Sequence, residues 1–367
     1  MRKSLIIIFP DEWLSHSPTI LNITKSLSDV FDIRIFAIDD GVFRNPSLCG
    51  EEYIFIRINK ILSRFFLRKF RPLYDVIKAN RLKKAVTASV KSHKVDIVIG
   101  VDSVGLWVAQ QVFGKSHFLS LEVKKDCFFR SIDISHIESV VIQTEERYNY
   151  LFDKSRSHTF FIQNSPPFSK STAVTKIPFQ KKLIFFGMVH PNHGLYACLN
   201  TMELMVKSDE GYRLTLKGVI SKERVRAFMM VRYRRLIENN IITIDEQYTN
   251  QDEIIPYLSS FDIGFCLYDF RLISKNDFNY ITIPSGKLFN YYAAGVPVIG
   301  VDIPGLQSVR EFQSGILLDN LSADAIKNAI IKISADYAFF STNCLKAAEH
   351  FDFQKAVQPY KDFLSAE

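Results

Sequence analysis

The stretch IPSGKLFNYYAAGVPVI, residues 283–299, combines residue types that suit the binding of an anion. Pro284 fixes the entry into a predicted helix, Ser285 stands at its cap position, and Gly286 lets a ligand approach the backbone. The first amide N–H groups of a helix have no partner within it and lie at the positive end of its dipole. Lys287 adds a full charge beside them. The pattern predicts a site for a phosphate or diphosphate, with a capped helix and a solvated lysine as the alternative.

Acidic side chains follow predicted strands in the first half of the chain. Glu122 comes at the end of the strand expected at 117–121, and Asp102 follows the strand expected at 96–100. A carboxylate in such a place can accept a proton from a hydroxyl group as a general base. The loop after the first predicted strand adds a third polar group: Asp11, Glu12 and His16. For each of these residues, a helix cap or a surface ion pair is the alternative role.

Short apolar runs alternate with stretches of helical period along the chain, which is typical of parallel α/β architecture. The strands predicted in the first half are 4–9, 33–37, 53–58, 96–100, 117–121, 139–143 and 159–163. Those in the second half are 182–187, 212–217, 241–244, 262–268, 296–301 and 316–318. Helices are predicted at 18–27, 193–207, 221–238, 250–259, 285–294, 323–335 and 342–365.

The pattern of strands and helices stops at NSPPFSKSTAVTKIP, residues 164–178, whose Ser, Thr and Pro content is typical of a linker. We therefore predict two Rossmann-like domains, at 1–165 and 181–345, with a linker at 166–180 and a terminal helix within 346–367. Parallel sheets bind ligands beyond the carboxyl ends of their strands, so two such sheets facing a central cleft can hold one substrate each. That arrangement suits a transferase.

The composition, 47% apolar and 23% charged, is that of a globular protein, and no apolar run approaches the roughly 20 residues that span a bilayer. The first residues, MRKSLIIIFPDEW, imitate an export signal, but Pro10 and Asp11 end the apolar run early, which predicts a strand instead. The five cysteines are scattered and odd in number, which suits reduced thiols in a cytoplasm. We expect a cytoplasmic protein.

The formal net charge of +7 is concentrated in one segment. Residues 57–84 hold ten Lys and Arg against one Asp, a local charge of +9, so the rest of the chain sums to −2. Aromatic and basic residues alternate there at helical spacing: Arg64, Phe65, Phe66, Arg68 and Arg71. Such a segment is typical of helices that lie on anionic membranes or contact a membrane-bound acceptor. The alternative is a packed helix with a solvated basic face, and nucleic acid is not expected as a partner.

Four stretches of the second half together resemble the motifs of one known family: LIFFGMVHPNHGLYACLNTM, YRLTLKGV, NNIITIDEQYTNQDEIIPYLSSFDIGFCLYD and PSGKLFNYYAAGVPVIGVDIPGLQSVREFQSGILL. They resemble the donor domain of nucleotide-sugar glycosyltransferases of the two-Rossmann GT-B fold, especially the retaining family 4 (group 1). VDIVIGVDSVGLWVAQQ and ESVVIQTEERYNYLF resemble the acceptor domain more loosely. AAEHFDFQKAVQPYKDFL resembles the family's last helix, which returns to the first domain.

The resemblance implies that the donor's diphosphate binds at Ser285, Gly286 and Lys287. The family carries two glutamates eight positions apart, one near the donor sugar and one on the ribose hydroxyls. Here Thr282 and Asn290 take their places, and the Asn290 amide can still bind a ribose diol.

The glycine turn of the donor domain also departs from the family. Its paired basic residues are replaced, since Met188 follows Gly187 and His193 precedes Gly194. We expect His190 and His193 to donate to a phosphate and not to bind a metal, because no third ligand is near in sequence. Lys217, at the end of the strand at 212–217, is expected to supply the missing charge, with an exposed strand-end lysine as the alternative.

The resemblance implies a metal-independent, retaining glycosyltransferase of the hexosyltransferase type. It would move a sugar from a nucleotide sugar to a glycolipid or glycan in lipopolysaccharide, capsule or exopolysaccharide synthesis. No cofactor is expected, and the protein would work in the cytoplasm or at the inner face of the plasma membrane. The alternatives are an inactive nucleotide-sugar-binding or scaffold subunit and a GT-B nucleotide-sugar epimerase.

Overall fold

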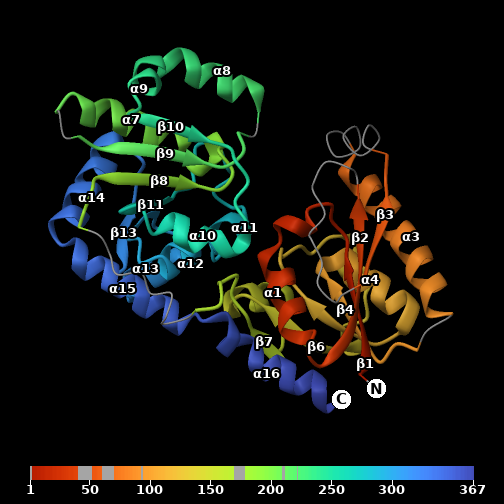
Figure 1. Ribbon diagram of the computed structural model, residues 1–367. Helices are drawn as coiled ribbons and strands as arrows, with labels where there is room; N and C mark the ends of the chain where they lie inside the picture. Colours follow the sequence, from red (N-terminus) through yellow and green to blue (C-terminus); the bar gives the residue numbers. More distant parts are fainter. Residues whose placement is uncertain are drawn as a thin grey trace. The chain divides into compact units, whose positions relative to one another are not determined.

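The computed structural model describes residues 2–39, 52–59, 70–91, 94–168, 178–208, 211–220 and 222–367; for His16 it describes the backbone only. The chain forms two compact units, Met1–Gln163 together with Phe353–Glu367, and Asn164–Asp352. Each contains a parallel sheet with helices packed on it (Figure 1). The predicted fold class, two Rossmann-like α/β units, is confirmed.

The first unit is built on a seven-stranded sheet in the order β3-β2-β1-β4-β5-β6-β7. Its strands are β1 Lys3–Phe9, β2 Phe31–Asp39, β3 Glu52–Arg57, β4 Ile97–Val101, β5 Ser116–Leu119, β6 Ile137–Ile142 and β7 Thr159–Phe161. Its helices are η1 Leu14–His16, α1 Pro18–Leu27, α3 Arg71–Val90, α4 Asp102–Phe113, α5 Cys127–Ser131, η2 Ile134–His136, α6 Glu145–Leu151 and α16 Phe353–Ala366. The strand order reverses between β1 and β4, which is where sheets of this kind bind ligands.

Strand β1 supplies the core on both faces of this sheet. Its side chains alternate in direction, so Leu5 and Ile7 pack with α1 and α16, while Ile6 and Ile8 pack with α3 and α4. The last helix, α16, adds four buried side chains to the first of these clusters: Phe353, Val357, Tyr360 and Leu364. A strand buried on both faces explains why 5–9 is a continuous apolar run.

The second unit has a six-stranded sheet in the order β10-β9-β8-β11-β12-β13. Its strands are β8 Lys182–Phe186, β9 Arg213–Lys217, β10 Ile242–Asp245, β11 Ile263–Cys266, β12 Val298–Val301 and β13 Gly315–Leu318. Its helices are η4 Pro191–His193, α7 Leu195–Val206, α8 Glu223–Arg232, α9 Arg234–Glu238, α10 Gln251–Leu258, α11 Phe278–Thr282, α12 Gly286–Ala293, η5 Pro304–Leu306, α13 Ser308–Glu311, α14 Ala323–Ala335 and α15 Tyr337–His350.

The predicted terminal helix at 342–365 is wrong, because the structure has two helices there, α15 and α16. The chain turns at Phe351 and Asp352. The Phe351 ring packs on Phe289 at 5.2 Å between centroids, and the Asp352 carboxylate accepts a hydrogen bond of 2.9 Å from the amide of Phe168. These tertiary contacts end the helix at a place where the sequence has no Gly or Pro.

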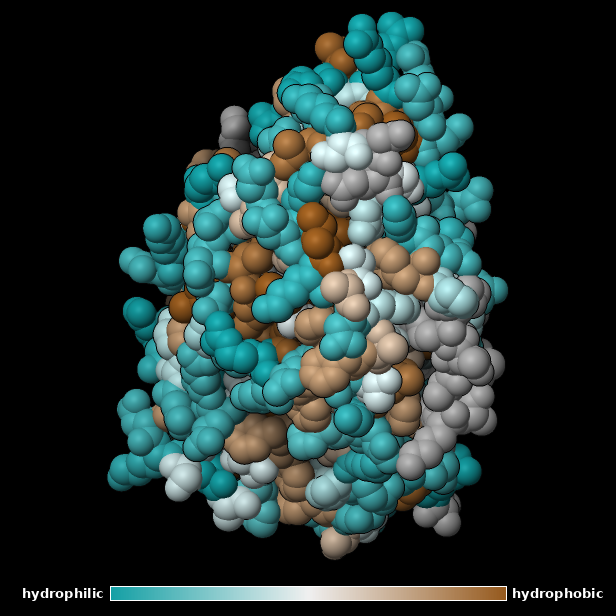
Figure 2. Space-filling view, turned by 90° about the vertical axis from the view of Figure 1, so that its left-hand side faces the viewer, coloured by the Kyte–Doolittle hydropathy of each residue, from teal (hydrophilic) through white to brown (hydrophobic). Residues whose placement is uncertain are grey.

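Hydrophilic side chains cover most of the face seen in Figure 2, and the hydrophobic ones form small groups between them. Within the described ranges, no helix has both the length and the apolar character that crossing a membrane requires.

Candidate functional site

Helix α12 begins at the stretch that the sequence singled out. Ser285 occupies the N-cap position, but its side chain makes no capping hydrogen bond, so the predicted capping role is wrong. The hydroxyl instead lies by Cys266 and Tyr268. The amide of Leu288 is satisfied by the Ser285 carbonyl at 2.9 Å. The helix therefore starts without a capping hydrogen bond from its N-cap side chain, and first-turn amides that have no partner within a helix can donate to an anion.

Lys287 lies between two aromatic rings, 5.7 Å from the centroid of Phe185 and 5.3 Å from that of Tyr268. Burial lowers the pKa of its ammonium, and the thiols of Cys266 and Cys198 oppose that shift. Among the described residues, no carboxylate stabilises this charge. A largely buried cation without an anionic partner is unfavourable, so an anion at the start of α12 would stabilise it.

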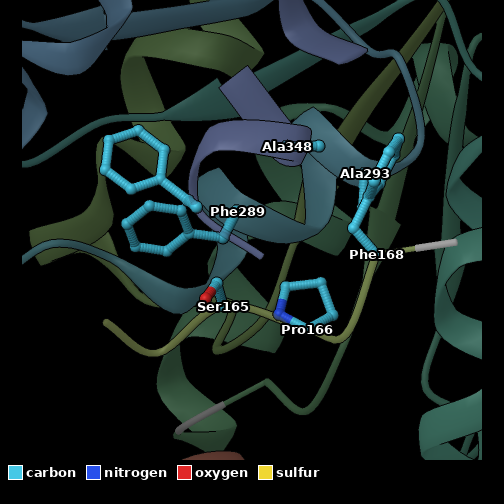
Figure 3. A pocket seen from close by; sticks show the side chains of 7 residues that line it. Ser165, Pro166, Phe168, Phe289, Ala293 and Ala348 are labelled. Atoms are coloured by element: carbon cyan, nitrogen blue, oxygen red, sulfur yellow. The ribbon is translucent and has the colours of Figure 1, made fainter. Parts of the chain in front are cut away.

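The rest of α12 is held by apolar packing. Phe289 and Ala293 pack against Ser165, Pro166 and Phe168 (Figure 3), and this depression leaves no room for a water-sized sphere. On another side of the helix, the Tyr291 hydroxyl accepts from the amide of Phe186 at 3.1 Å. The helix is thus held by packing and hydrogen bonding along its length.

Gly286 lies against the side chain of Asn164. A Cβ at this position would lie 2.5 Å from the amide nitrogen of the Asn164 side chain, so the missing side chain makes room for Asn164. Asn164 brings an amide group to the start of α12. Nothing in the sequence pattern pointed to this residue, because the contact joins positions far apart in the chain.

The turn after β8 brings Gly187 beside Gly218. Gly187 has φ 102° and open space around its Cα, and a Cβ on Gly218 would lie 1.9 Å from the Gly187 carbonyl oxygen. The close approach requires glycine at position 218, and the left-handed backbone at position 187 favours glycine there. Met188 follows in this turn with 57% of its surface exposed.

The two histidines of the turn have opposite hydrogen-bonding roles. His193 Nδ1 lies 3.2 Å from the carbonyl oxygen of Met188, so it carries the proton and leaves Nε2 as an acceptor. His190 Nδ1 accepts from the amide of Asn192 at 3.1 Å, so its proton lies on Nε2, which is a donor. The prediction that both donate to a phosphate fits His190 only.

His193 is also kept neutral. Burial, and after it the charge of Lys287, lowers the pKa of its imidazole to about 3. Its ring meets Tyr268 edge-on, with 5.7 Å between centroids. His193, Tyr268 and Lys287 therefore form one group in the second unit, with a single positive charge among them.

Lys217 is not part of this group. Its side chain is buried, and its ammonium donates to the Gln247 carbonyl at 2.8 Å and pairs with Asp245 at 3.0 Å. It also lies 4.9 Å from the ring centroid of Tyr257. The predicted phosphate contact and the alternative of an exposed lysine are both wrong. The ammonium is buried and binds Asp245, at the end of β10, and Gln247 in the loop that follows, so it stabilises that loop.

Thr282 and Asn290 differ in their access to solvent. Thr282 is 1% exposed, and its hydroxyl donates to the Phe278 carbonyl of its own helix α11 at 2.6 Å. The predicted contact of Thr282 with a donor is therefore wrong. Asn290 is partly exposed and lies one helical turn after Lys287, so the two share a face of α12.

In the first unit, Asp102 lies at the point where β4 becomes α4. Its φ of 50° is left-handed, a strained conformation for a residue with a side chain. Its Oδ1 accepts from the amides of Leu121 at 2.7 Å and Glu122 at 2.9 Å. Burial, and after it the charge of Glu122, raises the pKa of the Asp102 carboxyl to about 7. This carboxyl is poised to exchange a proton near neutral pH.

Glu122 is partly exposed and forms an ion pair with Lys124. The two predicted carboxylates are thus brought together at the ends of neighbouring strands β4 and β5. Arg147, which the sequence did not single out, is fully buried beside them and donates to the Leu121 carbonyl at 2.9 Å.

The loop after β1 lies at the same edge of the sheet. Asp11 pairs with Lys78 of α3 at 2.8 Å, and Glu12 accepts from the Tyr74 hydroxyl at 2.5 Å. Burial raises the pKa of Glu12. Asp11 is therefore the anion of an ion pair within the first unit, the role that the sequence left as the alternative. Tyr74 and Lys78 were missed because only the fold brings α3 to this loop.

Of the other predicted residues, Arg71 is exposed at the start of α3. His16 belongs to η1, where the structure describes its backbone alone. The predicted membrane residues Arg64, Phe65, Phe66 and Arg68 lie outside the described residues.

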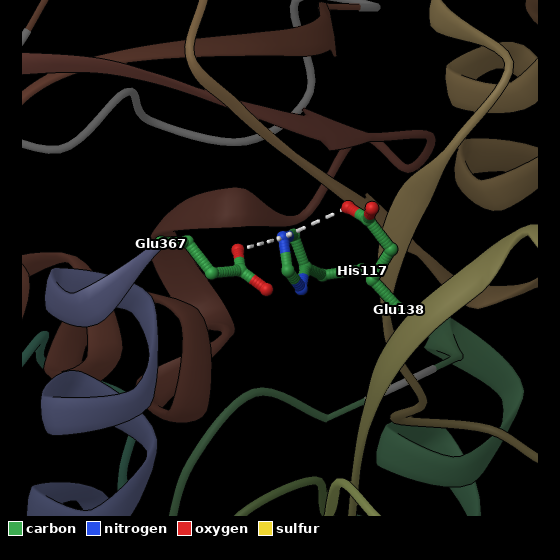
Figure 4. A group of neighbouring side chains, drawn as sticks. All are labelled: His117, Glu138 and Glu367. Carbon is green, nitrogen blue, oxygen red and sulfur yellow. Dashed lines mark ion pairs between the residues drawn. The ribbon is translucent and has the colours of Figure 1, made fainter.

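One group in the described part of the chain has the composition of a metal site (Figure 4): His117, Glu138 and Glu367. His117 is buried, and its Nε2 lies 3.1 Å from a Glu367 oxygen and 3.7 Å from a Glu138 oxygen. Its Nδ1 lies 2.9 Å from the Ser139 hydroxyl. His117 and Glu138 are at the amino ends of β5 and β6, away from Asp102, so the group ties the end of α16 to the sheet.

Comparison with known proteins supports the resemblance of the second unit to the donor domain of glycosyltransferases. Residues 180–336 match the family model described as "Glycosyl transferases group 1". None of the curated proteins matches the chain in sequence.

Solved structures resemble the whole chain in fold. WaaG, a glycosyltransferase involved in lipopolysaccharide biosynthesis, has a TM-score of 0.67 at 10% identity, over 99% of this chain and 100% of that chain. An α,α-trehalose-phosphate synthase (UDP-forming) from Burkholderia vietnamiensis gives 0.65 at 10% identity, with 100% of both chains covered. An E. coli trehalose-6-phosphate protein bound with UDP-2-fluoro glucose gives 0.64 at 11% identity, over 99% of both. The resemblance seen in the sequence is confirmed: the chain has the fold of the GT-B glycosyltransferases, and its residues 180–336 match the group 1 family.

Proposed function

We propose that the protein transfers a sugar from a nucleotide-sugar donor to an acceptor. The observation that carries this proposal is Lys287, a largely buried cation that no carboxylate of the described residues stabilises, beside helix amides that the N-cap side chain of Ser285 does not cap. A diphosphate supplies the missing negative charge and accepts from those amides. The family match and the UDP-sugar named for a structural neighbour support a nucleotide sugar as the source of that diphosphate.

Each residue around Lys287 then has a role set by its hydrogen-bonding character. His190 donates from Nε2 to a phosphate oxygen, and His193 accepts from a sugar hydroxyl through Nε2. Asn290, one turn along α12, binds the ribose diol. Holding the leaving diphosphate lowers the barrier to breaking the anomeric bond, because negative charge grows on that group in the transition state. Lys287 and the amides can meet this charge without a metal ion or other cofactor.

On the acceptor side, we propose Asp102 as the proton acceptor and Glu122 as a second polar contact. A carboxyl with a pKa of about 7 can accept a proton from a hydroxyl group near neutral pH. The acceptor is a glycolipid or glycan of surface-polysaccharide assembly, as the lipopolysaccharide role named for one neighbour supports. The resemblance to family 4 supports retention and hexosyl transfer as parts of the proposal, and the basic segment 57–84 would hold the enzyme at an anionic membrane surface.

One observation favours a second candidate, a nucleotide-sugar-binding subunit without activity. Met188 is uncharged and exposed, and neutral His193 leaves Lys287 as the one cation of its group. A site with a single cation holds a diphosphate less firmly than one with several.

The test is turnover with a panel of nucleotide sugars, measured with and without extracted membrane glycolipids. Release of the nucleoside diphosphate that depends on the extract, with a labelled sugar appearing in the lipid fraction, is the expected result. Thermal stabilisation by one nucleotide sugar with no turnover under any condition would support the binding subunit instead. Lys275→Ala, at an exposed position of the same unit, is the matched control for Lys287→Ala in both measurements.

A further inference from the structure

A groove opens between three helices of the first unit, α3, α4 and α5. It has a volume of about 340 Å³ and is lined by Val76, Ala79, Asn80, Trp107, Cys127, Phe128 and Ser131. This volume lies within the roughly 300–1,000 Å³ of small-molecule sites, and a mostly apolar lining with few polar groups is usual for them. None of these residues belongs to the sites described above.

Helix α3 divides this groove from the polar residues at the sheet edge. Tyr74 and Lys78 face inward and contact Glu12 and Asp11. Leu73, Val76, Asn80 and Lys83 follow one another at intervals of three and four residues, so they share a second face of the helix. The groove lies along that face, because Val76 and Asn80 line it.

Large apolar side chains are exposed where α3 begins. Phe70 is 53% exposed, Leu73 50% and Val76 41%. Scattered exposed apolar residues are ordinary, but these three follow one another and lead to an apolar groove. The free energy of such an apolar surface is lower in contact with hydrocarbon than in contact with water.

The surroundings of the groove are basic. Helix α3 contains five Lys and Arg and one Asp, and that Asp75 already pairs with Lys78 at 3.1 Å. Arg71, Arg81 and Lys84 are exposed, and the Lys83 ammonium lies 5.4 Å from the ring centroid of Trp107 in the groove wall. Tryptophan, with its apolar ring and polar N–H group, and lysine, with its alkyl chain and charged end, are typical of surfaces that contact the head-group region of a bilayer.

We propose that this groove binds one acyl chain of an anionic phospholipid when the outer face of α3 lies on a membrane. The apolar lining takes the chain, and the exposed cations of α3 meet the negative head groups. The proposal rests on the membrane part of the proposed function and is independent of sugar transfer. It adds a defined lipid site within the described residues to the predicted contact of the segment 57–84.

The chain has two tryptophans, and one of them lines the groove, so fluorescence can report on it directly. In the Trp13→Phe variant, Trp107 is the single tryptophan. Bromine atoms on a lipid chain quench tryptophan only at close contact. The probes are phosphatidylglycerol and phosphatidylcholine vesicles whose acyl chains carry bromine, each with its unbrominated counterpart.

Brominated phosphatidylglycerol vesicles are expected to quench most Trp107 emission, and phosphatidylcholine vesicles little of it. Leu73→Gln with Val76→Gln should reduce the quenching several-fold, whereas Ala88→Gln, at an exposed position three turns farther along α3 and outside the groove, should leave it unchanged. If Trp13→Phe does not fold, the quenching of Trp107 can be obtained from the difference in emission between the wild-type protein and Trp107→Phe.

Vesicle flotation, run in parallel, distinguishes binding of an acyl chain in the groove from simple contact of the protein with the membrane. Flotation with phosphatidylglycerol but no quenching of Trp107 would overturn the groove and leave the membrane contact standing. Absence of both would overturn both. Equal quenching by the two lipids would overturn the requirement for an anionic head group.

Discussion

The charge of Lys287 reaches the imidazole of His193, whose pKa burial and this neighbouring ammonium lower to about 3. The lysine loses basicity too, since burial lowers the pKa of its own ammonium. The two side chains thus stand together as one cation and one neutral acceptor. This relationship sets what the turn after β8 offers: one cation that suits an anionic group and one neutral acceptor that suits a hydroxyl.

His193 should stay neutral throughout the physiological range. Its folded pKa of about 3 lies below the ordinary 6.5, so the unfolded chain binds a proton in the window between these values and the folded chain does not. The contribution of His193 to stability is therefore complete above pH 6.5 and falls as the pH is lowered towards 3. NMR titration should show no shift of the His193 ring between pH 5 and 8. A His193 resonance that titrates near 6.5 would contradict the geometry.

His193→Asn should keep a hydrogen-bond acceptor near the same place, whereas His193→Ala should remove it. If Nε2 accepts from a sugar hydroxyl, alanine should raise KM for the nucleotide sugar about 10-fold, as expected for one net hydrogen bond of about 1 kcal/mol or slightly more. Binding of the free nucleoside diphosphate should not change. Equal losses for both ligands would assign His193 to the phosphates instead.

Asp102→Asn should separate the structural role of this residue, as an acceptor for two backbone amides, from its proposed role as a proton acceptor. The amide oxygen can still accept from the amides of Leu121 and Glu122, so the fold is expected to persist. The raised pKa means that the folded state binds a proton that the unfolded state releases between pH 4 and 7. Asp102 therefore costs stability as the pH rises through this window, and the variant should gain stability relative to wild type by an amount that grows from pH 4 to 7.

Urea unfolding at pH 4.5 and 7.5 measures that gain, and turnover measures the chemistry. Loss of a positioned general base should lower kcat about 100-fold or more while leaving KM for the donor nearly constant. Full activity of Asp102→Asn would exclude it as the base and leave Glu122.

Lys217→Met should act on stability. Removing this cation leaves Asp245 without its ion pair and the Gln247 carbonyl without a donor. Breaking a buried pair costs about 3–5 kcal/mol, and we expect about 2 kcal/mol here because Asp245 retains partial exposure and the Tyr257 hydroxyl at 2.9 Å. Chemical unfolding gives this value, and Tyr257→Phe is the control that removes the smaller contact. An unchanged free energy of unfolding would show that the lysine is not structural.

Many strands of the fold could be predicted from the sequence, because a strand buried on both faces has apolar residues at consecutive positions. The strands predicted at 4–9 and 182–187 overlap β1 and β8 almost fully. The start of α12 was also readable, since Pro284, Ser285 and Gly286 are local signals. The break between α15 and α16 was not, because packing of Phe351 against distant rings decides it.

The roles of individual site residues were harder to predict for a related reason. Lys217 and Thr282 have the residue types and strand or helix ends that suit a ligand contact, yet each finds its partner inside the protein. Side-chain direction depends on neighbours that the sequence does not reveal. The tautomers of His190 and His193 likewise depend on the Asn192 amide and the Met188 carbonyl.

The central claim is that Lys287 is a cation held in place for a diphosphate, and Lys287→Met tests it with one titration. A methionine removes a poorly solvated charge, so the variant should be at least as stable as the wild type. Calorimetric titration with a nucleoside diphosphate should show affinity reduced about 10- to 100-fold, because a charge-assisted hydrogen bond contributes about 1.5–3 kcal/mol. Lys275→Ala should bind as the wild type does. Unchanged affinity in a folded Lys287→Met variant would contradict the account.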